Sequence, residues 1–81
     1  TPLHSACRGG HPNIVELLLK KGADLHANGK FSGTPLHSAC YHGHLNIVKL
    51  LLQNGAVPHI KNGDGETPLV MAREWGHKDI V

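Results

Sequence analysis

The sequence predicts an all-α fold, an α-solenoid of stacked helix-turn-helix units that are joined by β-turn fingers. The first observation is a repeat, because Thr-Pro-Leu begins at Thr1, Thr34 and Thr67 with a spacing of 33 residues both times. Over the first 23 residues of this period, the first two copies are identical at 17 positions. A period of roughly 20–50 residues is typical of solenoids, in which each unit covers the apolar face of its neighbour. The period divides the chain into units 1–33, 34–66 and 67–81.

Each unit begins with the signals of a short helix. Threonine is a favoured N-cap residue, and proline suits the first helical position because its missing N–H would have no helical partner there. About two turns later comes a glycine, a residue that commonly ends helices in the left-handed conformation. We therefore expect a first helix in each unit, running from the threonine to Gly10, Gly43 or Gly76.

A second helix follows in each of the first two units. It is expected to begin near Pro12 and Leu45 and to end before Gly22 and Gly55. Its Ile-Val-x-Leu-Leu-Leu block is apolar over more than half of the circumference, and such a helix must be covered on two sides. The third unit reaches only the first turn of this helix at Val81. Because about three units are needed for a stable stack, we expect the chain to be a segment of a longer array.

The links between units, Asp24–Gly33 and Val57–Glu66, are rich in glycine and asparagine and contain isolated β-forming residues. This composition predicts extended chain around a tight turn.

Four blocks of the period, Thr-Pro-Leu-His, Gly-His, Ile-Val-x-Leu-Leu-Leu and Gly-Ala, resemble the ankyrin repeat, and the resemblance covers the whole chain. It implies a protein–protein interaction module, a scaffold or adaptor that binds a protein partner through its concave helical face and finger tips without catalysis of its own. The family's finger usually has the pattern Asp-x-x-Gly-x-Thr. Residues 62–67 nearly follow it, whereas residues 29–34 lack the acidic residue and have a displaced glycine.

Eight histidines in 81 residues suggest a metal site, but most of them recur with the period. Zinc would need about four converging ligands, and the nearest pairs, Cys7 with His11 and Cys40 with His44, supply two each. We therefore expect no metal and no cofactor. The resemblance instead implies that the histidine of each Thr-Pro-Leu-His block accepts a hydrogen bond from the threonine hydroxyl and donates one to neighbouring backbone. The structural-motif residues so identified are Thr1, His4, Thr34, His37 and Thr67.

Cys7 and Cys40 occupy the same slot of adjacent units, where a free cysteine acts as a small buried hydrophobe. Helices packed in register lie about 8–10 Å apart, beyond the roughly 7 Å between Cα atoms that a disulfide allows. The cysteines should therefore stay reduced, which favours an intracellular location, cytoplasmic or nuclear. A Cys-His catalytic dyad is disfavoured because active sites do not come in tandem copies and no orienting third group is present.

Composition excludes several other classes of function. Eight basic and six acidic residues give a net charge of +2, too little for the basic footprint of a nucleic-acid binder. No apolar run approaches the roughly 18 residues of a membrane span, so we expect no membrane insertion. Phosphate-binding and dinucleotide-binding glycine loops are absent from the sequence. We expect a monomeric array.

Function should reside in the positions that differ between units. All three aromatic residues, Phe31, Tyr41 and Trp75, fall in this variable set, and aromatic and arginine side chains dominate binding hot spots. The resemblance places these positions on the concave face and the finger tips. The predicted partner-binding residues are Arg8, Lys30, Phe31, Tyr41, His42, Asp64, Glu66, Glu74 and Trp75.

Three alternatives remain open. Tyr41 and Trp75 could flank a methylated lysine, with Glu74 supplying charge, which would make the chain a reader of a modified peptide. The chain could also be the non-catalytic targeting region of a larger signalling protein or enzyme. More simply, the aromatic rings could only cover their own helix ends. Separately, Leu18 and residues 24–26 resemble the motif that asparaginyl hydroxylases modify in ankyrin repeats, which makes His26 a candidate for hydroxylation.

Overall fold

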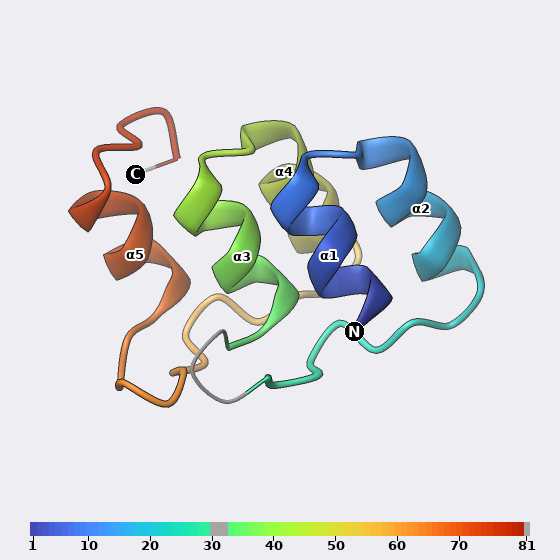
Figure 1. The fold of residues 1–81 in the computed structure, drawn as a ribbon, viewed down its shortest axis with the longest axis horizontal. Coiled ribbons are helices and arrows are strands. Elements are labelled where there is room, and N and C mark those ends of the chain that lie inside the picture. Colours follow the sequence, from blue (N-terminus) through green and yellow to red (C-terminus); the bar gives the residue numbers. More distant parts are fainter. Residues whose placement is uncertain (30–32, 81) are drawn as a thin grey trace.

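Two helical hairpins and a single helix follow one another along the chain in the computed structural model, which describes residues 1–29 and 33–80 (Figure 1). Within these ranges every regular element is an α-helix, so the predicted all-α class is confirmed. The first helices of the units begin at the predicted prolines, and the second helices end just before Gly22 and Gly55. The helices are α1 (Pro2–Gly9), α2 (Pro12–Lys20), α3 (Pro35–His42), α4 (Leu45–Gln53) and α5 (Pro68–Glu74).

The first helix of each unit lies beside the first helix of the next. Figure 1 shows α1, α3 and α5 side by side along the long axis of the molecule, and α3 packs against both neighbours. Helices α2 and α4 pack against each other and against the first helix of their own hairpins. Equivalent residues of successive units therefore come to lie next to one another.

Threonine caps begin all three first helices. The hydroxyl oxygens of Thr1, Thr34 and Thr67 accept hydrogen bonds from the backbone N–H three residues later. Helices α1 and α3 end at Gly10 and Gly43, whose φ angles of 75° and 73° lie in the left-handed region. Glycine is needed there for a second reason, because a Cβ atom would lie 2.8 Å from the His44 ring at Gly10 and 2.6 Å from the His77 ring at Gly43.

The core lies between the two layers of helices. The two second helices, α2 and α4, differ in how far their apolar side chains are buried. In α4, Ile47 is 1% exposed and Leu51 is fully buried. In α2, Ile14 and Leu17 are 49% and 55% exposed. Helix α2 is covered by α1 and by α4, yet these two side chains of its apolar block stay about half-exposed.

Buried Asn62 holds the turn of the second finger. Its side-chain oxygen accepts hydrogen bonds from the N–H groups of Asp64 and Glu66 at 3.0 and 2.9 Å. Its own N–H donates to the Glu66 carbonyl at 2.9 Å. Asn28 of the first finger donates from its side chain to the Lys61 carbonyl at 3.3 Å, so the two fingers are joined.

Candidate functional site

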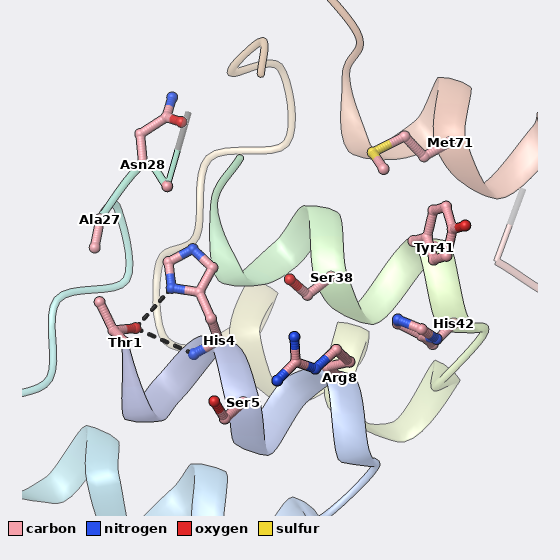
Figure 2. A pocket seen from close by; sticks show the side chains of 11 residues that line it. Thr1, His4, Ser5, Arg8, Ala27, Asn28, Ser38, Tyr41, His42 and Met71 are labelled. Carbon is pink, nitrogen blue, oxygen red and sulfur yellow. Dashed lines mark hydrogen bonds between the residues drawn. The ribbon is translucent and has the colours of Figure 1, made fainter. Parts of the chain in front are cut away.

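A groove of about 520 Å³ lies along α1 and α3 and extends to the first finger and α5 (Figure 2). We call the side of α1, α3 and α5 that carries this groove the concave face. Three predicted partner-binding residues line it, with Arg8 coming from α1 and Tyr41 and His42 from α3. The whole lining consists of Thr1, His4, Ser5, Arg8, Ala27, Asn28, Gly29, Ser38, Tyr41, His42 and Met71.

Beneath the groove, His37 joins its own unit to the next finger. Its Nδ1 accepts from the Thr34 N–H at 3.0 Å and lies 2.9 Å from the Thr34 hydroxyl oxygen. Its Nε2 lies 2.7 Å from the carbonyl oxygen of Glu66, which can only accept, so Nε2 carries the proton. The ring is fully buried, and this burial lowers the pKa of His37. A neutral imidazole therefore satisfies every partner.

His4 repeats this arrangement at a more open place. Its Nδ1 lies 2.6 Å from the Thr1 hydroxyl oxygen (Figure 2). Its Nε2 donates to the Gly33 carbonyl at 2.7 Å. The third unit has Val70 at this slot, so Thr67 keeps only its capping hydrogen bond. These threonine and histidine side chains hold helix to finger, and they leave little hydrogen-bonding capacity for a ligand.

Two further histidines join the units at the other end of the helices. The Nε2 atoms of His44 and His77 donate to the carbonyl oxygens of Arg8 and Tyr41 at 3.1 and 2.8 Å. In the sequence, these histidines are marked only by their place directly after Gly43 and Gly76. The recurrence of Gly-His in every unit is the signal that could have indicated a contact between units.

Tyr41 and Trp75 form an aromatic pair across two units. Their ring centroids lie 4.7 Å apart at an interplanar angle of 54°, and the ring of His42 lies 4.8 Å from that of Tyr41. Tyr41 is half-buried, whereas Trp75 is 56% exposed. The two rings pack directly on each other, so a methylated ammonium cannot lie between them as the reader alternative requires.

Charge differs between the two ends of the concave face. Arg8 and His42 are exposed near the α1 side, where partial loss of hydration and repulsion from His44 and Arg8 lower the pKa of His42. On the α5 side, the Glu74 carboxyl group shares a hydrogen bond with that of Glu66, which raises the pKa of Glu74.

The other predicted residues lie apart from the groove or outside the described residues. Asp64 is exposed at the turn of the second finger. His26 is exposed after α2, and its backbone N–H donates to the Asp24 carboxylate at 2.8 Å. Lys30 and Phe31 fall outside the ranges that the structure describes.

Cys7 and Cys40 are free and buried, and burial raises the pKa of each thiol to about 12. Such thiols are protonated at neutral pH and are poor nucleophiles. Within residues 1–29 and 33–80, no three His, Cys, Asp or Glu side chains are grouped to hold a metal ion. The helices of the same ranges are all too short or too polar to cross a membrane.

Stacked helical hairpins with β-turn fingers, in which the variable residues gather on one side of the first helices, define a helical solenoid. A family model of three ankyrin repeats matches residues 3–81, so the chain belongs to the ankyrin repeat family. Repeats of this family generally act as protein–protein interaction modules. A search of curated proteins found no match.

Proposed function

We propose that this chain is a protein–protein interaction module, a scaffold or adaptor that binds a protein partner through its concave face and finger tips. The aromatic pair of half-buried Tyr41 and exposed Trp75 supports the proposal most directly. Trp75 keeps 56% of its surface accessible beside a groove of about 520 Å³. A rigid ring offers a partner much apolar area at little entropic cost, and tryptophan and tyrosine are enriched among binding hot spots.

The proposed module has no catalysis of its own. The histidines beneath the groove are engaged in scaffold hydrogen bonds, and the two thiols are buried and protonated. Reduced thiols fit a cytoplasmic or nuclear location, and the same binding face would serve a targeting region of a larger protein. Lys30 and Phe31 belong to the proposed surface on sequence grounds, and Asp64 belongs to it as an exposed finger residue.

The test is affinity capture of cellular proteins on the wild-type chain and on the Tyr41→Ala/Trp75→Ala double variant. A partner bound through the concave face should be enriched on the wild type and lost from the double variant. Leu52→Ala, which removes an exposed apolar side chain from α4, is the matched control and should capture the same partner. Thermal melts by circular dichroism check that the variants are folded. Equal capture on all three folded proteins would exclude the concave face as the binding surface.

A further inference from the structure

One position of the repeat has a different kind of side chain on each of the three first helices. The 33-residue period places Arg8, Tyr41 and Glu74 at equivalent positions of α1, α3 and α5. Because α3 packs between the other two helices, the aromatic residue lies between the base and the acid (Figure 1). The concave face is therefore positive at one end, aromatic in the middle and negative at the other end.

The positive end is available to a ligand. Arg8 is exposed, lines the groove and extends between α1 and α3 near Ser38 (Figure 2). Among the described residues, the carboxylates all lie beyond ion-pairing distance of its guanidinium group, since the ion pair found there joins Lys20 to Glu16. His42 adds a second hydrogen-bonding side chain on the same rim. A guanidinium fork matches the geometry of a carboxylate, which it binds through two parallel N–H···O bonds.

At the negative end, Glu74 and Glu66 form no ion pair with a basic side chain of the residues that the structure describes. Glu74 and Glu66 approach each other closely enough to share a hydrogen bond, although like charges repel. A lysine or arginine from a partner would relieve this repulsion. Between the two ends, the Tyr41–Trp75 pair supplies an apolar platform.

The spacing of the helices sets the spacing of the partner's residues. Neighbouring packed helices lie about 8–10 Å apart, and an extended peptide in the polyproline II conformation advances about 3.1 Å per residue with three residues per turn, so that every third side chain lies on the same side. Three residues of an extended peptide therefore cover the step from one helix to the next. A seven-residue segment covers the distance from Arg8 to Glu74.

We propose that the concave face binds an extended segment of a partner protein whose acidic, apolar and basic residues follow one another at three-residue spacing. The acidic side chain pairs with Arg8, the apolar one packs on Tyr41, and the basic one pairs with Glu74. Either chain direction satisfies this pattern, because it is the order of charges along the groove that matters. The inference rests on the proposed function and adds the chemistry of the partner.

The test is a selection of random twelve-residue peptides, displayed on phage, against the 81-residue chain and its charge variants. The wild type should enrich peptides with an acidic and a basic residue six positions apart and an apolar residue midway. Arg8→Glu should shift the selection to two basic residues, and Glu74→Lys should shift it to two acidic residues. The Arg8→Glu/Glu74→Lys double variant should again select one residue of each sign. Lys49→Glu, an exposed change on α4, is the control and should leave the wild-type selection unchanged.

Binding of one enriched peptide is then measured by fluorescence anisotropy. Reversing either charge should weaken it by about 3- to 10-fold, since an attraction between exposed charges becomes a repulsion. Peptides that need Tyr41 but ignore both reversals would overturn the inference and leave the proposed function standing. Peptides whose binding survives Tyr41→Ala would count against both. Selection of phosphorylated peptides alone from a phosphoserine library, or no enrichment over bare resin, would overturn the charge pattern.

Discussion

Replacing His37 by valine removes the ring that joins the second unit to the second finger. Valine is the residue that the third unit has at this slot, as Val70, and it keeps the helix cap at Thr34 intact. The substitution therefore removes the three contacts of the imidazole nitrogens. Those contacts reach the Thr34 N–H at 3.0 Å, the Thr34 hydroxyl at 2.9 Å and the Glu66 carbonyl at 2.7 Å.

The expected loss follows from the burial of those partners. Thr34 is 2% exposed, so water cannot replace the lost acceptor of its N–H group. A buried donor left unpaired costs roughly 1–3 kcal/mol. The Glu66 carbonyl keeps the hydrogen bond from the Asn62 N–H, so the loss of its second bond adds only about 1 kcal/mol. We expect His37→Val to lower the free energy of unfolding by about 3 kcal/mol.

The assay is urea denaturation followed by far-ultraviolet circular dichroism. His4→Val is the matched control, because it removes the equivalent contacts at a site where Thr1 is exposed and water can take the place of the ring. It should cost about 1 kcal/mol. Equal losses for the two variants would show that burial of the hydrogen bonds does not set their contribution, and a loss below about 1 kcal/mol for His37→Val would refute the reasoning outright.

Three further predictions concern the pKa of His37, the burial of Ile47 and the exposure of His26. Because burial lowers the pKa of His37, its contribution to stability is complete above the unperturbed pKa of about 6.5 and is lost progressively as the pH falls from there to the lowered pKa of the folded state. The urea midpoint should be lower at acidic than at neutral pH, and less so in His37→Val; equal midpoints in the wild type would contradict this. Ile47→Ala should cost about 2–5 kcal/mol in a melt, whereas Ile14→Ala at the same slot should cost much less because its side chain is half-exposed. Exposed His26 should gain one oxygen by intact mass when the chain is incubated with an asparaginyl hydroxylase, and an unchanged mass would exclude the hydroxylation.

Local signals in the sequence were enough to predict the helices. Threonine and proline set where α1, α3 and α5 begin, and left-handed glycines end α1 and α3, because capping depends on residues close in the chain. The expected end at Gly76 is wrong for α5, which ends at Glu74 with Trp75 as its C-cap. The all-α class followed from the repetition of these signals at a fixed period.

Contacts between units were harder to predict, because a period does not give the rotation and offset between stacked units. The hydrogen bond from His77 to the Tyr41 carbonyl joins residues 36 positions apart, and the Tyr41–Trp75 contact depends on the same offset. The cover of a helix depends on its neighbours, so Ile14 and Ile47 look alike in sequence and differ in exposure.

The most direct test of binding through the concave face is the dissociation constant of the captured partner for the wild type and for the Tyr41→Ala/Trp75→Ala double variant. Each ring is expected to contribute about 2 kcal/mol, so each loss should raise the dissociation constant about 30-fold. Titration calorimetry should therefore detect tight binding to the wild type and little or no heat with the folded double variant. An unchanged dissociation constant for that variant would contradict a binding surface centred on these two rings.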